Sequence, residues 1–114
     1  MKEFNVLIWD FNKDIVGPYD VMPYFRDAYA KRVDDYKQYG DDAYFKVPKT
    51  YNEVKDFIID EARYRFWGRC EYEFIMHGWP VRKNDYKIDV YEQLMMNIDI
   101  IAEMFYNELK ENEH

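Results

Sequence analysis

Three residues that could hold a metal ion or exchange protons share one face of a predicted strand. The segment Cys70–His77 alternates in its pattern, which places Glu71, Glu73 and His77 on the same face. Carboxylates at this spacing can bind Mg²⁺ or Mn²⁺, and a pair of such ions can support hydrolysis of a phosphodiester. The alternative is an ordinary solvated strand face, whose carboxylates pair with the arginines that precede the strand.

Enzyme motifs of high specificity are absent from the sequence. It has no glycine-rich phosphate loop, no dinucleotide fingerprint, no paired Cys or His at metal-binding spacing and no Gly-x-Ser-x-Gly. Cys70 has no base within reach, because His77 lies at the other end of the same strand and on its opposite face. We therefore predict no catalytic residue and no cofactor, and we favour a protein that is not an enzyme.

A second constellation joins carboxylates to aromatic side chains. Aspartate pairs bracket two tyrosines at the end of the first predicted helix, and the last predicted helix adds further carboxylates. These residues are Asp34, Asp35, Tyr36, Tyr39, Asp41, Asp42, Asp99 and Glu103. Rows of carboxylates can imitate a phosphate backbone and occupy a nucleic-acid channel lined with Lys and Arg. The alternative is a solvated face, and Lys31, Arg32 and Lys37 dilute the charge of the first cluster.

Trp79 completes the set of residues that we predict to bind a partner. It stands in the break Gly78-Trp79-Pro80 after the predicted strand, where a large side chain either closes the core or faces a partner. Trp, Tyr and Arg dominate the energetics of protein interfaces, so we include Trp79 among the candidate binding residues while both roles stay open. Trp67, in contrast, continues the apolar stripe of the preceding helix, and we assign it to the core.

Composition limits the classes of partner. The chain has 114 residues, a formal net charge of -7 and 20% aromatic residues. The excess of acid argues against direct binding to nucleic acid, because that affinity comes from Lys and Arg. A single cysteine excludes an internal disulfide, and no apolar run approaches the length of a membrane span. We expect a soluble cytoplasmic protein with no membrane or nucleic-acid partner.

Hydrophobic periodicity and turn residues predict the elements that position these groups. Strands are expected at Glu3–Phe11 and Cys70–His77, and a short third strand at Val81–Lys87 is an option. Helices are expected from Val21 to Gly40, from a capping box at Thr50 to about Phe66, and from Val90 onwards. The sequence thus predicts a single α+β domain over residues 1–114, in the order β-α-α-β-(β)-α, with helices packed on a small sheet.

Several strings of the sequence resemble small uncharacterised proteins of phages and mobile elements of Gram-positive bacteria. The strings are Pro18–Tyr24, Trp67–Glu73, Trp79–Pro80, Ile88–Tyr91 and Met95–Asp99. The resemblance covers most of the chain and brings no established catalytic residue with it. It implies a context, since small acidic phage proteins include many anti-CRISPR inhibitors.

Charge, aromatic content and resemblance together predict a non-enzymatic inhibitor. We expect it to bind a protein partner with a basic nucleic-acid-binding surface, such as a Cas nuclease, in the manner of an anti-CRISPR protein. Two alternatives stay open at this point. One is a metal-dependent phosphodiesterase or nuclease that uses Glu71, Glu73 and His77, and the other is a homo-oligomeric structural protein whose Tyr and Met residues form a homodimer face.

Overall fold

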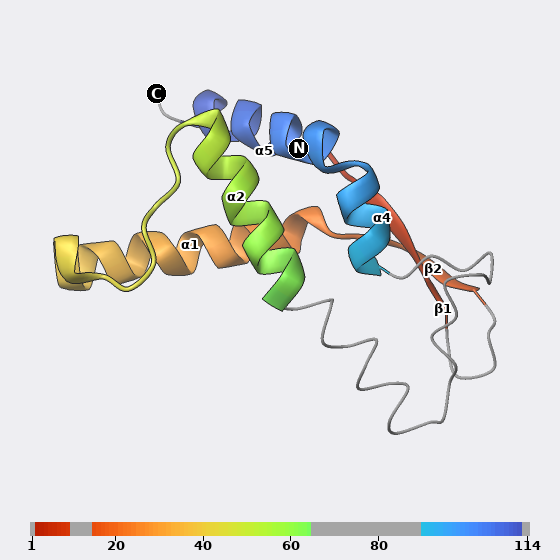
Figure 1. Cartoon of the computed structure of the whole chain (residues 1–114), viewed down its shortest axis with the longest axis horizontal. Helices are drawn as coiled ribbons and strands as arrows, with labels where there is room; N and C mark the ends of the chain where they lie inside the picture. The colour runs from red at the N-terminus through yellow and green to blue at the C-terminus, as the bar shows by residue number, and fades with distance from the viewer. Residues whose placement is uncertain (1, 10–14, 65–89, 113–114) are drawn as a thin grey trace, which may run out of the picture.

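The computed structural model describes residues 2–9, 15–64 and 90–112, and these form an antiparallel hairpin with four α-helices (Figure 1). The elements are β1 (Asn5–Trp9), β2 (Ile15–Asp20), α1 (Met22–Tyr39), the 3₁₀ turn η1 (Gly40–Asp42), α2 (Tyr51–Ala62), α4 (Val90–Met96) and α5 (Ile98–Glu111). The α+β class is confirmed. The predicted strands at Cys70–His77 and Val81–Lys87 lie outside the described residues, so this part of the order stays a prediction.

Strand β2 occupies a segment where the sequence indicated only a connection. Gly17 and Pro18 are residue types that mark turns, and the sequence predicts no element between Phe11 and Val21. Both nevertheless lie in β2, which pairs antiparallel with β1. The register passes from Val6–Tyr19 to Ile8–Val16, so two residues of β2 face one residue of β1. Such a bulge leaves a position without ladder hydrogen bonds, which is where a proline can stand in a strand. The chain therefore begins β-β-α and not β-α.

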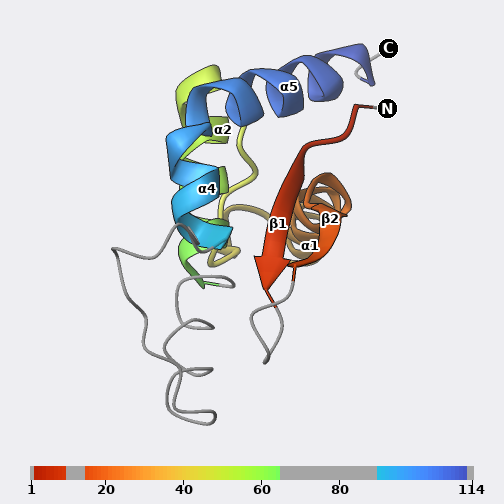
Figure 2. The same cartoon turned by 90° about the vertical axis from the view of Figure 1, so that its right-hand side faces the viewer.

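Asp20 ties the hairpin to the start of α1. Its Oδ1 accepts hydrogen bonds from the backbone N–H of Met22 at 3.1 Å and of Phe4 at 3.0 Å. The sequence predicts Asp20 as the cap of a helix that begins at Val21, but the helix begins at Met22, its N-cap residue is Val21, and no side chain caps it. Asp20 instead links the hairpin to the start of α1 (Figure 2). Pro23 stands in the first turn, where its missing N–H removes no helical hydrogen bond. The helix ends as predicted at Gly40, whose φ of 60° is easily adopted by glycine.

Helix α2 begins at the predicted capping box. The Thr50 hydroxyl accepts from Glu53 N–H at 3.2 Å, and Glu53 Oε1 accepts from Thr50 N–H at 3.0 Å. Hydrogen bonds from the backbone of Thr50, then from the backbone of Lys49, hold the pKa of Glu53 below its ordinary value. This reciprocal pair fixes the point at which the chain returns from α1 to the core.

The last predicted helix is two helices, α4 and α5, that meet at an angle at Asn97 (Figure 1). Asn97 Nδ2 donates to Gln93 O at 2.9 Å, and its backbone carbonyl accepts from Ile101 N–H at 3.0 Å. An asparagine side chain that bonds to a nearby backbone carbonyl competes with the regular hydrogen bonds of a continuous helix. The break directs Leu94 of α4 and Ile101 of α5 into one core from two directions.

The core receives side chains from β1, the residue that follows β2, and all four helices. Its buried members are Val6, Val21, Met22, Phe25, Ala28, Val54, Phe57, Ile58, Ala62, Leu94, Ile101, Ala102 and Phe105. At its centre the rings of Phe57 and Phe105 stack with centres 5.8 Å apart, and Tyr29 meets both edge-on. The apolar stripe predicted for α2 is confirmed by its buried residues. A large part of the aromatic surplus therefore belongs to the core.

Candidate protein-interaction surface

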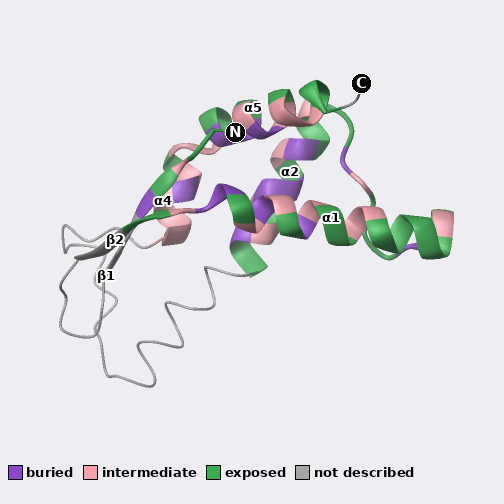
Figure 3. Cartoon of the chain, turned by 180° about the vertical axis from the view of Figure 1, so that it is seen from behind, coloured by how far each residue is buried: buried purple, intermediate pink, exposed green. Residues whose placement is uncertain are grey.

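Helix α1 is packed at one end and exposed at the other. Its buried residues, Met22, Phe25 and Ala28, all lie in the first two turns. None of the residues from Ala30 to Tyr39 is buried. The end of α1 extends beyond α2 and α5 (Figure 1), and seen from behind it is green and pink, without purple (Figure 3). Because core contacts do not account for these side chains, the second half of α1 is available to a partner.

The α1 tip, defined as residues 34–45, gathers most of the residues that the sequence predicted. It contains Asp34, Asp35, Tyr36, Tyr39, Asp41 and Asp42, all of them exposed. Tyr36 is 49% exposed and Tyr39 is 56% exposed. All six lie at the end of α1 or in η1, and their role in binding a partner stays a prediction. Gly40 ends the helix between the two aspartate pairs, so Asp34 and Asp35 lie on α1 and Asp41 and Asp42 lie in η1.

Two further aromatic residues belong to the α1 tip: Tyr44, which the sequence leaves outside every predicted stripe and beside the carboxylates, and Phe45, which was not among the predicted binding residues. Tyr44 is 89% exposed and Phe45 is 50% exposed, and their rings meet edge-to-face with centres 4.7 Å apart. Tyr44 fits no apolar stripe of a predicted helix or strand, and this was the signal in the sequence that its side chain is exposed. Nothing local distinguished Phe45 from a core residue. Its exposure follows from its position in the segment between η1 and α2.

Arg32 holds this segment against the body of the protein. Its guanidinium carbon lies 4.9 Å from the ring centre of Phe45 and 4.6 Å from that of Phe57. The same group forms an ion pair with Glu61 at 3.3 Å and donates to the Lys46 carbonyl at 3.2 Å. Arg32 Nε is buried without a hydrogen-bond partner in the described part of the chain. Arg32 does not dilute the acidic surface as the sequence suggested, because its charge is turned inward and paired.

The carboxylates of α5 form a separate surface. Asp99 and Glu103 are exposed in the first turns of α5, whereas the α1 tip lies at the far end of another helix (Figure 1). Asp99 pairs with Lys55 of α2 at 2.8 Å, and this hydrogen bond raises the pKa of Lys55. The pair joins two helices on an exposed face, where such pairs contribute little to stability. The two groups of predicted carboxylates therefore do not form one continuous row.

The remaining predicted residues fall in 65–89. Trp79, Glu71, Glu73 and His77 lie outside the described residues, so their roles stay predictions. Within residues 2–9, 15–64 and 90–112, no group of three or more His, Cys, Asp or Glu residues is placed to hold a metal ion. No helix in the same ranges is long and apolar enough to cross a membrane.

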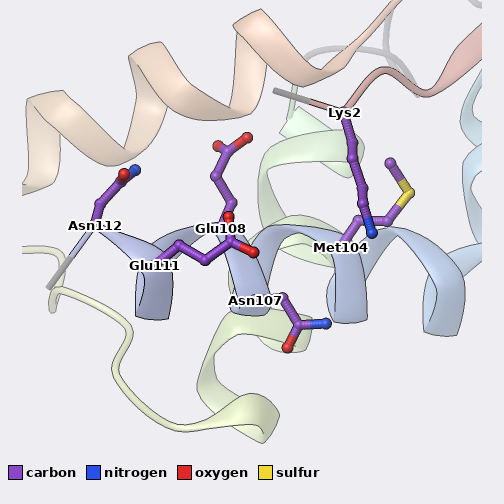
Figure 4. Close-up of a pocket in the computed structure, with 6 residues that line it drawn as sticks. All are labelled: Lys2, Met104, Asn107, Glu108, Glu111 and Asn112. Carbon is purple, nitrogen blue, oxygen red and sulfur yellow. The ribbon is translucent and has the colours of Figure 1, made fainter.

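A groove of about 360 Å³ runs along the C-terminal half of α5 (Figure 4). It is lined by Lys2, Met104, Asn107, Glu108, Glu111 and Asn112. Arg26 of α1 binds Glu108 through two hydrogen bonds of 2.9 Å and donates a third of 2.9 Å to the Lys2 carbonyl. The bond to Glu108 raises the pKa of Arg26. Arg26 of α1 thus connects Glu108 of α5 to the N-terminal segment. None of the predicted site residues lines the groove.

No protein-family model, curated protein or solved structure matches this chain significantly. Function must therefore be inferred from the surface chemistry of the described residues. Among the surfaces above, the α1 tip combines exposed aromatic rings with carboxylates, whereas in the groove on α5 Glu108 is already bound to Arg26.

Proposed function

We propose that the protein is a non-enzymatic inhibitor of phage or mobile-element origin that covers a basic nucleic-acid-binding surface of a host machine. The partner that we expect is a CRISPR–Cas effector, as for an anti-CRISPR protein. The α1 tip is the docking surface in this proposal. The observation that supports it is the exposure of four aromatic rings among four aspartates at the end of one helix.

The charge of the α1 tip favours a basic partner. Residues 34–45 contain four aspartates and one lysine, a formal charge of -3. Complementary charge accelerates encounter with a partner and fixes the orientation of docking. Two copies of this chain would meet tip to tip with like charges, which disfavours a homodimer through this surface. The resulting contact is expected to weaken as salt is added, because exposed charges are screened.

The aromatic residues supply the packing that charge alone does not. Tyr36, Tyr39, Tyr44 and Phe45 present large rigid faces, and aromatic residues are enriched where interfaces gain most of their energy. Tyrosine also loses little conformational entropy on binding, since only two side-chain torsions become fixed. The segment that carries Phe45 is already held by Arg32, which reduces the ordering cost further.

Pull-down and cleavage assays with purified CRISPR effectors test the proposal. The wild-type chain is expected to bind an effector at low salt and to suppress its cleavage of DNA or RNA. The double variant Tyr36→Ala/Tyr39→Ala is expected to lose at least about tenfold in affinity, since a truncated hot-spot residue costs about 2 kcal/mol or more. The matched control Asp99→Asn/Glu103→Gln alters the other carboxylate surface and should retain binding.

The outcome that contradicts the proposal is equally concrete. Absence of binding to every effector tested at low salt, where charge pairing is strongest, would remove its basis. Loss of binding in the α5 charge variant, with binding kept in Tyr36→Ala/Tyr39→Ala, would show that general acidity acts, and not the aromatic residues of the α1 tip.

A further inference from the structure

We propose that the α1 tip selects arginine over lysine side chains on its partner. This inference rests on the proposed function and adds to it the chemistry by which a basic surface is recognised. Three features support it: an arginine already bound within the chain, a repeat of the same kinds of groups further along α1, and the difference between the two cations.

The chain itself shows how it accommodates a guanidinium group. Arg32 lies between the rings of Phe45 and Phe57, at 4.9 Å and 4.6 Å from their centres. Its charge is met by Glu61, which also accepts from the Tyr24 hydroxyl at 3.4 Å. Aromatic faces and a carboxylate thus surround one planar cation at the base of the α1 tip. Stacking on a ring and pairing with a carboxylate are the two contacts that favour arginine.

The same kinds of groups occur further along the same side of α1. Asp35, Tyr36 and Tyr39 follow Arg32 by three, four and seven residues, the spacing of one helical face. All three are exposed, whereas Arg32 is largely covered. A partner arginine laid along this face would meet tyrosine rings and a carboxylate, the two kinds of groups that hold Arg32. The exposed face of α1 therefore offers a partner arginine the two kinds of group, a ring and a carboxylate, that contact Arg32 within the chain.

Lysine satisfies such a surface less well. The guanidinium is planar and weakly hydrated, so it can lie flat on a ring while its N–H groups bind a carboxylate. The ammonium of lysine is compact and strongly hydrated, and it gives a point charge without a stacking face. The four aspartates attract both cations, and the selectivity comes from the rings and from the paired N–H donors of the guanidinium. One partly desolvated cation–π contact that arginine makes and lysine does not corresponds to a preference of about three- to tenfold.

Titration of the ¹⁵N-labelled full chain with two peptides tests the inference. The probes are a repeating Arg-Gly peptide and a repeating Lys-Gly peptide of equal length and charge, at about 0.01 M and about 0.15 M salt. We expect about three- to tenfold tighter binding of the Arg-Gly peptide, with amide shift changes confined to residues 34–45. The preference should persist at the higher salt, where charge attraction alone is reduced.

Two matched variants isolate the rings. Tyr36→Phe/Tyr39→Phe keeps both aromatic faces and should keep the preference for arginine. Tyr36→Leu/Tyr39→Leu keeps apolar bulk on the exposed helix but removes two of the four faces of the α1 tip, so the preference for arginine should shrink. Retention of the full preference by the leucine variant, or its loss in the phenylalanine variant, would overturn the inference.

The results also separate this inference from the proposed function. Equal binding of both peptides at the α1 tip would overturn arginine selectivity and leave a docking surface for basic partners. Binding of neither peptide at about 0.01 M salt would contradict both, because charge attraction is then least screened. Shift changes centred on α5 would assign docking to the other acidic surface and would also overturn the inference.

Discussion

The two halves of α1 have the same backbone conformation but different surroundings. From Met22 to Tyr29 the helix contributes Met22, Phe25 and Ala28 to the core, and from Ala30 to Tyr39 it contributes no buried residue. Helical spacing of aromatic residues is present in both halves, since Tyr36 and Tyr39 continue the pattern begun by Tyr24 and Phe25. The same pattern therefore serves stability in one half and, in our proposal, recognition in the other.

The difference between the halves arises from what lies opposite each of them. The first half packs against α2 and α5, where Tyr29 meets the rings of Phe57 and Phe105. Opposite the second half stands the segment after η1, which covers Arg32 with Phe45 but leaves Tyr36 and Tyr39 exposed. Periodicity identifies a helical face without identifying what that face contacts. Arg32 marks the boundary at which packing gives way to exposure.

Truncation of a buried ring in the first half should produce the largest effect. Phe25→Ala is expected to lower the free energy of unfolding by about 3–5 kcal/mol, because it removes apolar contacts and leaves a cavity. Tyr39→Ala in the second half should change it by no more than about 0.5 kcal/mol. Urea denaturation of both variants provides the measurement. Similar losses in the two variants would show that the exposed half is also part of the cooperative core.

Removal of the boundary arginine should have an intermediate effect. Arg32→Ala is expected to cost about 1–3 kcal/mol, because both ring contacts and the ion pair with Glu61 are lost. The backbone of residues 43–46 should become more mobile, with ¹⁵N order parameters falling from about 0.85 to below about 0.6. Lys31→Ala removes the same charge from an exposed neighbouring position and serves as the control. Unchanged order parameters in Arg32→Ala would mean that Arg32 does not hold this segment.

Weakening the far anchor of the same segment should have a smaller effect. Thr50→Ala removes the hydroxyl that accepts from Glu53 N–H and is expected to cost about 1 kcal/mol of stability. Thermal unfolding of the variant beside Asn52→Ala, an exposed neighbour in the first turn, measures the loss. An effect on peptide binding at the α1 tip larger than the effect on stability would show that both anchors preorganise the tip. An unchanged unfolding temperature would show that the capping box does not stabilise the protein.

The smallest expected effect is a pH dependence at the capping box. The pKa of Glu53 in the folded protein is lowered by hydrogen bonds from the backbone of Thr50 and Lys49. Its contribution is therefore fully present above the unfolded pKa, near 4.3, and is lost as pH falls through the lower folded value. The difference in unfolding midpoint between wild type and Glu53→Gln should be constant above about pH 5.5 and should shrink as pH falls. A difference in unfolding midpoint that grows as pH falls would contradict a lowered pKa of Glu53 in the folded protein.

Local signals predicted much of the fold, and long-range contacts explain the misses. The capping box at Thr50, the stop at Gly40 and the buried stripe of α2 depend on residues close in sequence, and all three were predicted. Strand β2 was missed because a bulge accommodates Gly17 and Pro18, and a bulge exists only with a partner strand. The break at Asn97 was missed because the apolar stripe continues on both sides of it.

In the candidate site too, the features set by neighbouring residues were predicted and those set by distant residues were not. Sequence proximity alone brought Asp34, Asp35, Tyr36 and Tyr39 together, since helical spacing places them within two turns. It did not show that Asp99 and Glu103 lie on a different surface, which depends on how α5 crosses the molecule (Figure 1). It also assigned Arg32 to the solvent, although Glu61 and two rings, distant in sequence, enclose its charge.

The sequence by itself determined the acidic excess, the capping box at Thr50, the helix end at Gly40 and the apolar stripe of α2, because each follows from composition or from neighbours within a few residues. The tertiary structure decided which aromatic residues are buried and which are exposed. That outcome depends on the residues that pack opposite each helix face, and these come from distant segments. The exposure of Tyr36, Tyr39, Tyr44 and Phe45, on which the proposed function rests, belongs to this second class.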